Sequence, residues 1–346
     1  MARIVIADDT SAYTGRSGEE IGLGGTESSV VQLATALAGR GHHVTALTKT
    51  SERLTHMGVD WAPLSDARLM ESVDLFLPVQ HPRLFHLVTR PRCLAVWLIW
   101  PVNNLRHYKR IPVMWRYRPL PVAASKWLVE TYSWVLPREP IVIPLAVQDE
   151  WRGLGPLGTP PSRRAVYASM PGRGLPWLLP VWDQHILPRV PDAELHILGI
   201  KNFASAYSTA VPDLPWISAM SDRGRASLRI HPTLRRTEQR EVMRNSRAYL
   251  YHGHRSEAFC LAAAEAQALG VPAVVGPNAV MPERVVDGVT GHVIDDPIAY
   301  ADAAVRLLTD DGQWRSMHDA SLRLQQGLSW DEVAAAFERS VLPKRS

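Results

Sequence analysis

Cysteine is scarce in this 346-residue chain, which contains only Cys93 and Cys260. Two cysteines exclude a disulfide framework and a multi-cysteine zinc site, and they fit a reducing compartment. The longest apolar run extends from Cys93 to Trp100, far short of the ~20 residues of a membrane-spanning helix. The opening MARIVIADD places acids where a signal peptide would continue its apolar segment. We therefore expect a cytoplasmic protein.

Lysine is also scarce, because only five of the 38 basic residues are lysine. Arginine suits bidentate binding of phosphate or carboxylate, although codon bias would produce the same excess. The formal net charge of +4 is too small to indicate a nucleic-acid partner. One stretch, RHYKRIPVMWRYR at residues 106–118, interleaves basic and aromatic side chains. It is either a solvated loop or a surface for an anionic acceptor or the inner face of a membrane.

The sequence contains two successive series of alternating predicted strands and helices. A chain of this length also favours two domains. Short apolar runs predict strands covered on both faces, as in parallel sheets. In the first half they are Arg3–Ala7, Val44–Leu47, Leu75–Val79, Leu94–Ile99, Val122–Ala124 and Ile141–Ile143. In the second half they are Ala165–Ala168, Glu194–Leu198, Arg247–Tyr251, Val271–Val275 and His292–Ile294.

The predicted boundary between the domains is the proline- and glycine-rich segment GLGPLGTPP at residues 153–161. We predict an α/β protein with two Rossmann-like domains that face each other across a cleft. The first spans 1–152, and a helix within 329–346 returns to it; the second spans 153–328. Ligands of such sheets bind at the carboxyl ends of the strands.

Three constellations could carry chemistry. The first is the glycine-rich loop Gly22-Leu23-Gly24-Gly25-Thr26 before a predicted helix, where backbone amides could approach an anion. It has neither the dinucleotide-binding spacing nor the P-loop lysine, and a plain strand-to-helix turn explains it equally well.

The second constellation is a pair of carboxylates, Glu257 and Glu265, in SEAFCLAAAEAQALGVP. Glu257 would lie at the mouth of a helix, and Glu265 two turns along it. Carboxylates bind sugar hydroxyls well. The alternative is that Glu257 caps the helix and Glu265 faces solvent, but a carboxylate in an apolar helix needs a partner, and a ligand is one candidate.

The third constellation is Arg173, flanked by Gly172 and Gly174 after a predicted strand and before a helix. A guanidinium and helix amides that converge there would suit a diphosphate. An ordinary surface arginine is the alternative interpretation.

In their order and spacing, these segments resemble the retaining nucleotide-sugar glycosyltransferases of the GT-B fold, family 4. EAFCLAAAEAQALGVPAV resembles the family's two glutamates separated by seven residues, and MPERVVDGVTGHVID resembles a second family segment. GLGGTESSVVQLATALAGRGHHVT is similar to the glycine-rich loop and first helix, and VAASKWL and VIPLAV to the end of the first domain. The resemblance covers nearly the whole chain.

The resemblance implies transfer of a sugar from a nucleoside-diphosphate sugar to an acceptor hydroxyl, with retention and without a metal or other cofactor. Glu257 would bind the donor sugar, Glu265 its ribose, and Arg173 the leaving diphosphate. Other donor-binding positions would be Gly24, Gly25, Ser169, Phe259, Cys260 and Leu261. The acceptor would be a carbohydrate, a lipid-linked group or a small molecule, in cell-surface polysaccharide, glycolipid or natural-product synthesis.

The sequence departs from the family pattern at three places. Ala168 stands where the family usually has a second basic residue, and Cys260 stands where glycine is usual. A histidine common after the strand at 94–99 is absent, so Asn103, Asn104 and Arg106 are the acceptor-binding candidates. The missing basic residue favours one alternative, a catalytically silent GT-B sugar-nucleotide-binding protein. Another GT-B enzyme, such as a sugar-nucleotide epimerase, is a second alternative.

Overall fold

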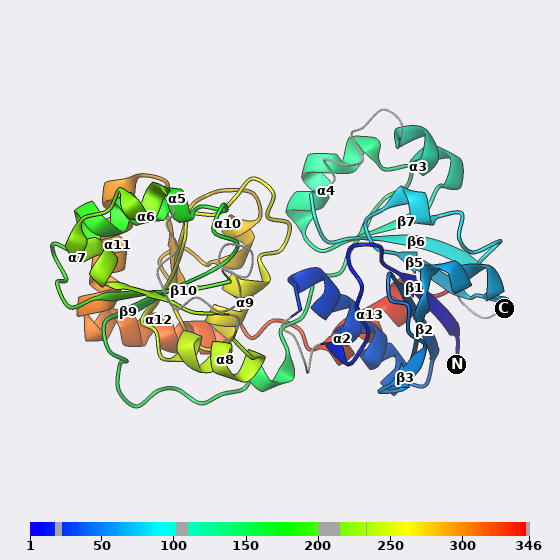
Figure 1. The fold of residues 1–346 in the computed structure, drawn as a ribbon, viewed down its shortest axis with the longest axis horizontal. Coiled ribbons are helices and arrows are strands. Elements are labelled where there is room, and N and C mark those ends of the chain that lie inside the picture. Colours follow the sequence, from blue (N-terminus) through cyan, green and yellow to red (C-terminus); the bar gives the residue numbers. More distant parts are fainter. Residues whose placement is uncertain (18–22, 102–109, 200–214, 233, 344–346) are drawn as a thin grey trace. The chain divides into compact units, whose positions relative to one another are not determined.

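The computed structural model describes residues 1–17, 23–101, 110–199, 215–232 and 234–343, and it divides the chain into two compact units (Figure 1). Unit 1 comprises Met1–Ala146 and Leu328–Ser346, and unit 2 comprises Val147–Gly327. The chain thus passes from unit 1 to unit 2 between Ala146 and Val147, before the glycine- and proline-rich segment at 153–161, which belongs to unit 2. Packing explains the difference, because Trp151 is fully buried and Arg152 donates to the backbone carbonyls of Gln326 and Gly327.

Unit 1 is built on an eight-stranded sheet of order β3-β4-β2-β1-β5-β6-β7-β8, parallel except for the β3–β4 pair. Its strands are β1 Arg3–Ala7, β2 His43–Thr48, β3 Leu54–His56, β4 Val59–Pro63, β5 Leu75–Pro78, β6 Cys93–Leu98, β7 Leu120–Ala123 and β8 Ile141–Val142. The six strands predicted in this half are confirmed, whereas the β3–β4 hairpin was not predicted. That hairpin turns at Met57 and Gly58, which both have positive φ, as its two-residue turn requires.

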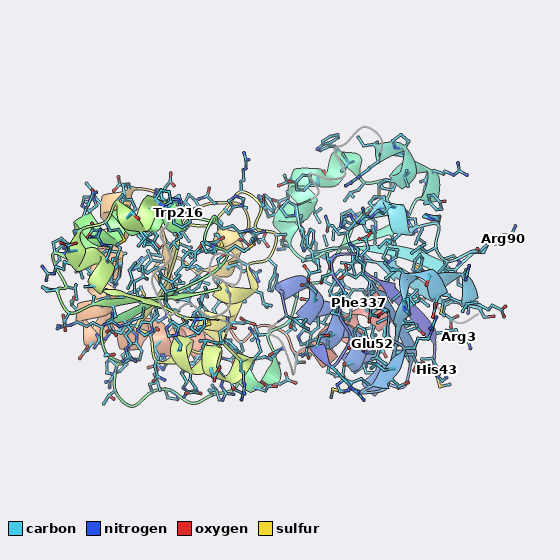
Figure 2. The ribbon with its side chains drawn as sticks, viewed as in Figure 1. Arg3, His43, Glu52, Arg90, Trp216 and Phe337 are labelled. Atoms are coloured by element: carbon cyan, nitrogen blue, oxygen red, sulfur yellow. The ribbon has the colours of Figure 1, made fainter. Side chains whose placement is uncertain are left out.

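The α-helices described in unit 1 are α2 Gly25–Gly39, α3 Ile111–Tyr117, α4 Lys126–Tyr132 and α13 Trp330–Ser340, and the short 3-10 helices are η1 Leu64–Leu69, η2 Pro82–Leu84 and η4 Ser133–Val135. The carboxyl-terminal helix α13 packs against α2, as Figure 1 shows, so its predicted return to the first domain is confirmed. Phe337, labelled in Figure 2, is fully buried with its ring 5.9 Å from that of Trp97 on β6.

Unit 2 contains a six-stranded parallel sheet of order β11-β10-β9-β12-β13-β14. Its strands are β9 Arg164–Ala168, β10 Glu194–Leu198, β11 Leu228–Ile230, β12 Ala248–Tyr251, β13 Ala273–Val275 and β14 Gly291–Val293. Numbered along the chain, this order is 3-2-1-4-5-6, that of a doubly wound nucleotide-binding fold, in which the strand order reverses between β9 and β12. Ligands of such folds bind outside the carboxyl ends of those two strands.

The helices of unit 2 are α5 Leu175–Val181, α6 Pro215–Ser218, α7 Asp222–Ala226, α8 Arg236–Arg244, α9 Leu261–Ala268, α10 Met281–Arg284, α11 Pro297–Thr309 and α12 Asp311–Leu324, with the single turn η5 Asp149–Trp151. Proline inside a helix removes a backbone hydrogen bond, and α5 ends one residue after Pro180, where the chain continues into the π-helical turn η6 Trp182–Ile186. None of the helices described in either unit is both long and apolar enough to span a bilayer.

Candidate functional site

The candidate site lies in unit 2, where the segments that follow β9 and β12 come together. Residues 169–174 lead from β9 to α5, and residues 252–260 lead from β12 to α9. The two loops approach closely: a Cβ atom on Gly174 would lie 3.1 Å from the carbonyl oxygen of Gly253. Gly174 also has a φ of +90°, so this position favours glycine for two reasons.

Arg173 and Glu257 form an ion pair across these loops. Nη1 of Arg173 lies 3.2 Å from Oε1 of Glu257, and the same oxygen accepts a 2.5 Å hydrogen bond from the hydroxyl of Tyr251. The Glu257 residue is only 7% exposed, so its carboxylate depends on these two partners, whereas the Arg173 side chain is 39% exposed. Burial and the neighbouring carboxylate raise the pKa of Tyr251 far above its ordinary value, so its hydroxyl stays protonated and donates.

Two tyrosines that the sequence analysis treated as strand core support the pair. The hydroxyl of Tyr167, on β9, donates to the backbone carbonyls of Met170 and Arg173, each at 2.8 Å. The Tyr167 and Tyr251 rings meet edge to face, with centroids 5.8 Å apart. Because both side chains lie in buried strands, their spacing in the sequence carries no sign that their hydroxyls position a loop and a carboxylate.

Cys260 caps the amino terminus of α9 in a left-handed conformation, with φ 58° and ψ 70°. This backbone explains why the family that the sequence resembles favours glycine there. The side chain is accommodated by burial: Sγ lies 3.9 Å from the hydroxyl of Tyr249. α9 has no side-chain cap, and the first amides of a helix lack partners within the helix, which is the arrangement that suits an anion.

Glu265 lies inside unit 2 rather than facing solvent, since it is 2% exposed. The structure supplies the partner that the sequence leaves open, because the guanidinium of Arg236, the first residue of α8, pairs with both carboxylate oxygens. Glu265 and Glu257 are thus both buried, and each forms an ion pair with its own arginine. Arg236 carries no local signal in the sequence, because its contact with Glu265 depends on how α8 packs.

Ala168 ends β9 and is buried, and Ser169 follows it, half-buried. A second cation nevertheless lies near the start of α9: the guanidinium carbon of Arg284 is 4.4 Å from the ring centroid of Phe259. Burial lowers the pKa of Arg284, and its Nε is buried without a hydrogen-bond partner among the described residues. Its positive charge lowers the pKa of the Cys260 thiol and so opposes part of the rise that burial causes.

In unit 1 the glycine-rich loop leads into α2. Gly24 caps this helix and Gly25 begins it, without a side-chain cap. The carboxylate of Glu27 occupies the same helix terminus: it accepts a 2.8 Å hydrogen bond from Ser11 Oγ, and a Cβ atom on Gly24 would lie 2.5 Å from its Oε2. An anion that approached these amides would meet this carboxylate. The acceptor candidates Asn103, Asn104 and Arg106 lie outside the described residues.

An acidic cluster that the sequence analysis missed lies at the carboxyl end of β1. Asp8 is fully buried and accepts hydrogen bonds from Thr10 Oγ1 at 2.6 Å and from the Tyr13 hydroxyl at 2.7 Å, while burial raises its pKa. Asp9 pairs with Arg83, and Nε2 of His81 lies 3.7 Å from its Oδ1. Burial lowers the pKa of His81. The signal was the unusual run ADD directly after a buried strand.

No group of three or more His, Cys, Asp or Glu residues within the described ranges is arranged to hold a metal ion. Metal independence itself stays a prediction.

Unit 2 is therefore a doubly wound domain that brings an arginine, Arg173, and a glutamate, Glu257, together at its switch point. Residues 164–310, all within this unit, match the family of glycosyl transferases group 1. A D-inositol 3-phosphate glycosyltransferase of Xylanimonas cellulosilytica is 33% identical over 139 residues, which cover 39% of this chain and 32% of that protein. The match thus spans about a third of that relative's length.

Solved structures resemble the chain along its whole length. Anabaena HepE in complex with UDP-glucose has a TM-score of 0.73 at 13% identity, with 98% of this chain and 99% of that one covered. Sucrose-phosphate synthase from Thermosynechococcus elongatus has a TM-score of 0.71 at 16% identity, with 98% of each chain covered. The predicted fold is confirmed: two Rossmann-like domains, as in GT-B glycosyltransferases.

Proposed function

We propose that this protein is a retaining glycosyltransferase that moves a sugar from a nucleoside-diphosphate sugar to an acceptor hydroxyl. The observation that carries the proposal is the Arg173–Glu257 pair, 3.2 Å apart at the β9/β12 switch point and next to the start of α9. A guanidinium, helix amides and a buried carboxylate in one place suit a diphosphate joined to a polyol. The family match over residues 164–310 supports the same activity.

In this proposal Arg173 and the first amides of α9, at Cys260 and Leu261, stabilise the negative charge that develops on the leaving diphosphate. Such preorganised groups usually make the largest contribution to catalysis. Glu257 accepts hydrogen bonds from donor-sugar hydroxyls, and Glu265 accepts them from the ribose. Ser169 and Phe259 complete the donor site proposed in unit 2, whereas the Glu27 carboxylate at the start of α2 disfavours an anion at Gly24 and Gly25.

The proposed step forms a bond between the acceptor oxygen and the anomeric carbon while the bond from that carbon to the diphosphate oxygen breaks. The acceptor attacks from the face that the diphosphate leaves, and its proton passes to the departing phosphate oxygen. The candidate carboxylate nearest the proposed sugar, Glu257, already holds Arg173 and Tyr251, so we assign it an orienting role rather than that of a nucleophile.

Binding of the donor can be tested without knowledge of the acceptor. Thermal melts with UDP-, GDP-, ADP- and CDP-sugars should show one nucleotide that raises the melting temperature, because a ligand bound only by the folded state stabilises it. Binding without release of nucleoside diphosphate would favour a catalytically silent sugar-nucleotide-binding protein. Ala168, which stands in place of a basic residue, is the observation that supports this alternative. A changed sugar nucleotide would favour an epimerase.

We also propose that the protein is cytoplasmic and contacts the inner face of the membrane through residues 106–118, bringing it to a carbohydrate or lipid-linked acceptor. Of this stretch the structure describes residues 110–118, in which Trp115 and Tyr117 are 49% and 37% exposed beside the exposed Arg116 and Arg118. Aromatic and basic side chains together suit the surface of an anionic bilayer.

Vesicle binding tests this contact. The double substitution Arg116→Gln with Arg118→Gln should weaken binding to phosphatidylglycerol-containing vesicles about 25-fold, since each cation near such a surface contributes about 1 kcal/mol. Arg315→Gln with Arg323→Gln removes the same charge from exposed positions on α12 and should have little effect. Equal binding by both double variants would contradict the proposed membrane contact.

A further inference from the structure

Helix α9 is bonded to both segments through which the chain leaves and enters unit 2. Gln326, near the end of this unit, donates from Nε2 to the carbonyl of Ala268, the last residue of α9, at 3.0 Å. Its Oε1 accepts a 2.6 Å hydrogen bond from the amide of Gly153, near the start of the unit. One side chain therefore joins the end of α9 to residues 147–153, which we call the entry segment, and to residues 324–327, the exit segment.

The entry and exit segments are also bonded directly to each other. Arg152 donates from Nε to the carbonyl of Gln326 at 2.9 Å and from Nη2 to that of Gly327 at 3.1 Å. A Cβ atom on Gly327 would lie 3.7 Å from Cγ2 of Val147. Hydrogen bonds thus connect the entry segment, the exit segment and the carboxyl end of α9 to one another.

A second connection runs from the middle of α9 to the entry segment through Arg236. Its guanidinium holds Glu265 on one side, while its Nε lies 3.4 Å from Oε1 of Gln148. The guanidinium carbon also lies 4.4 Å from the ring centroid of Trp151, which is fully buried. One residue therefore contacts the candidate ribose-binding carboxylate and two side chains of the entry segment.

The chemistry of this contact requires arginine. A carboxylate has about four lone-pair sites, so Glu265 can accept from Arg236 and still accept from two hydroxyls. The planar guanidinium pairs with both carboxylate oxygens and stacks on an indole at the same time, which a lysine ammonium cannot do. The contact also keeps the carboxylate in one orientation, since Glu265 is 2% exposed.

We propose that Arg236 is a positioning residue that orients Glu265 toward the ribose hydroxyls of the donor and couples donor binding to the entry segment. This inference rests on the proposed function, in which Glu265 binds the ribose. A bound ribose fixes Glu265, which restrains Arg236 and with it Gln148 and Trp151. Donor binding therefore reduces the local opening of the entry segment.

The test combines nucleotide-binding calorimetry with hydrogen–deuterium exchange, using UDP, GDP, ADP and CDP as probes. In the wild type, the nucleotide that binds should slow exchange in the entry segment. Arg236→Gln should bind that nucleotide at least about 10-fold more weakly, or about 1.4 kcal/mol. Its entry segment should no longer respond at saturating nucleotide. Arg236→Lys, which keeps the charge without the planar fork, should bind with intermediate affinity.

Two further variants separate positioning from a general effect on folding. Arg240 lies one turn along α8 and donates to the carbonyl of Glu150 at 2.9 Å. Because no contact to Glu265 is described for it, Arg240→Gln should keep wild-type affinity. Gln148→Ala should also keep most of the affinity but weaken the exchange response.

Wild-type affinity and a wild-type exchange response in Arg236→Gln would overturn this inference and leave the proposed function standing. If none of UDP, GDP, ADP and CDP bound to the wild type, the donor assignment itself would be contradicted, and the inference with it. Equal losses of affinity in Arg236→Gln and Arg240→Gln would also overturn it, because they would indicate a general effect on α8.

Discussion

The guanidinium of Arg173 and the carboxylate of Glu257 lie 3.2 Å apart, although 84 residues separate them in the chain. The parallel sheet brings them together, because β9 and β12 are neighbours and their carboxyl ends share one edge. The family resemblance predicts separate tasks for these residues, toward the diphosphate and toward the sugar. In the structure they are also partners, so each affects the other's position before any ligand arrives.

This partnership changes the expected stability of variants at the pair. Arg173→Ala removes one of the two partners of a buried carboxylate, and because Arg173 is partly exposed we expect a loss of about 1–2 kcal/mol. For a unit of this size that corresponds to a fall of about 2–8 °C in melting temperature. Differential scanning calorimetry measures it. Glu257→Gln keeps the shape and should melt closer to the wild type; the reverse order would contradict a structural role for the pair.

Tyr251→Phe removes the 2.5 Å hydrogen bond to Glu257 and leaves the aromatic ring in place. A hydrogen bond to a charged group contributes about 1.5–3 kcal/mol, so kcat/KM for the donor sugar should fall roughly 10- to 100-fold. Tyr249→Phe is the matched control, on the same strand and equally buried, with its hydroxyl toward Cys260 instead. Similar losses in both variants would show that strand packing, not the bond to Glu257, is responsible.

The histidine pair in unit 2 should make stability depend on pH. Nδ1 of His196 lies 3.0 Å from Nε2 of His231, and burial lowers the pKa of both rings, that of His231 to about 4. The unfolded chain then binds protons that the folded chain does not, so stability is complete above about pH 6.5 and falls toward pH 4. Melting temperatures measured across this range should drop, and less steeply in His231→Gln. An unchanged slope in that variant would exclude His231 as the source.

Both thiols should react slowly in the folded protein. Burial raises the pKa of Cys93 and of Cys260, and the Glu257 carboxylate raises that of Cys260 further, so little thiolate forms at neutral pH. A chromogenic disulfide reagent should titrate both thiols in denaturant and react much more slowly without it. Rapid reaction of a native thiol would contradict the burial described at that position.

Most of the sheet could be predicted because fully buried strands appear as short apolar runs, as at Arg3–Ala7 and Glu194–Leu198, which the structure reproduces. The hairpin β3–β4 was missed because LTH and VDWAP are short and partly polar. Proline and glycine at residues 153–161 mark a loop without showing which unit it packs on, and the two units divide between Ala146 and Val147. The contact of the Trp151 ring with Arg236 of unit 2 shows this, and such a contact is a tertiary property.

The site could be predicted only in part, for a related reason. The glycines beside Arg173 and the carboxylate of Glu265 in an apolar helix are local signals. Both residues lie in unit 2, Arg173 in the loop after β9 and Glu265 on α9. The partners are not local. Tyr251 and Arg236 act through contacts that depend on strand order and helix packing, and the resemblance that the sequence shows to a family carries no motif for them.

The most direct test of the account is the release of nucleoside diphosphate from UDP-, GDP-, ADP- and CDP-sugars, with water in place of the acceptor hydroxyl, by the wild type and by Glu257→Gln. Glu241→Gln, an exposed acid on α8, is the matched control. We predict release from one of these donors by the wild type and the control, and a loss of at least about 100-fold in Glu257→Gln, equivalent to about 2.7 kcal/mol. Full release by Glu257→Gln, or no release by the wild type from any of these donors, would contradict it.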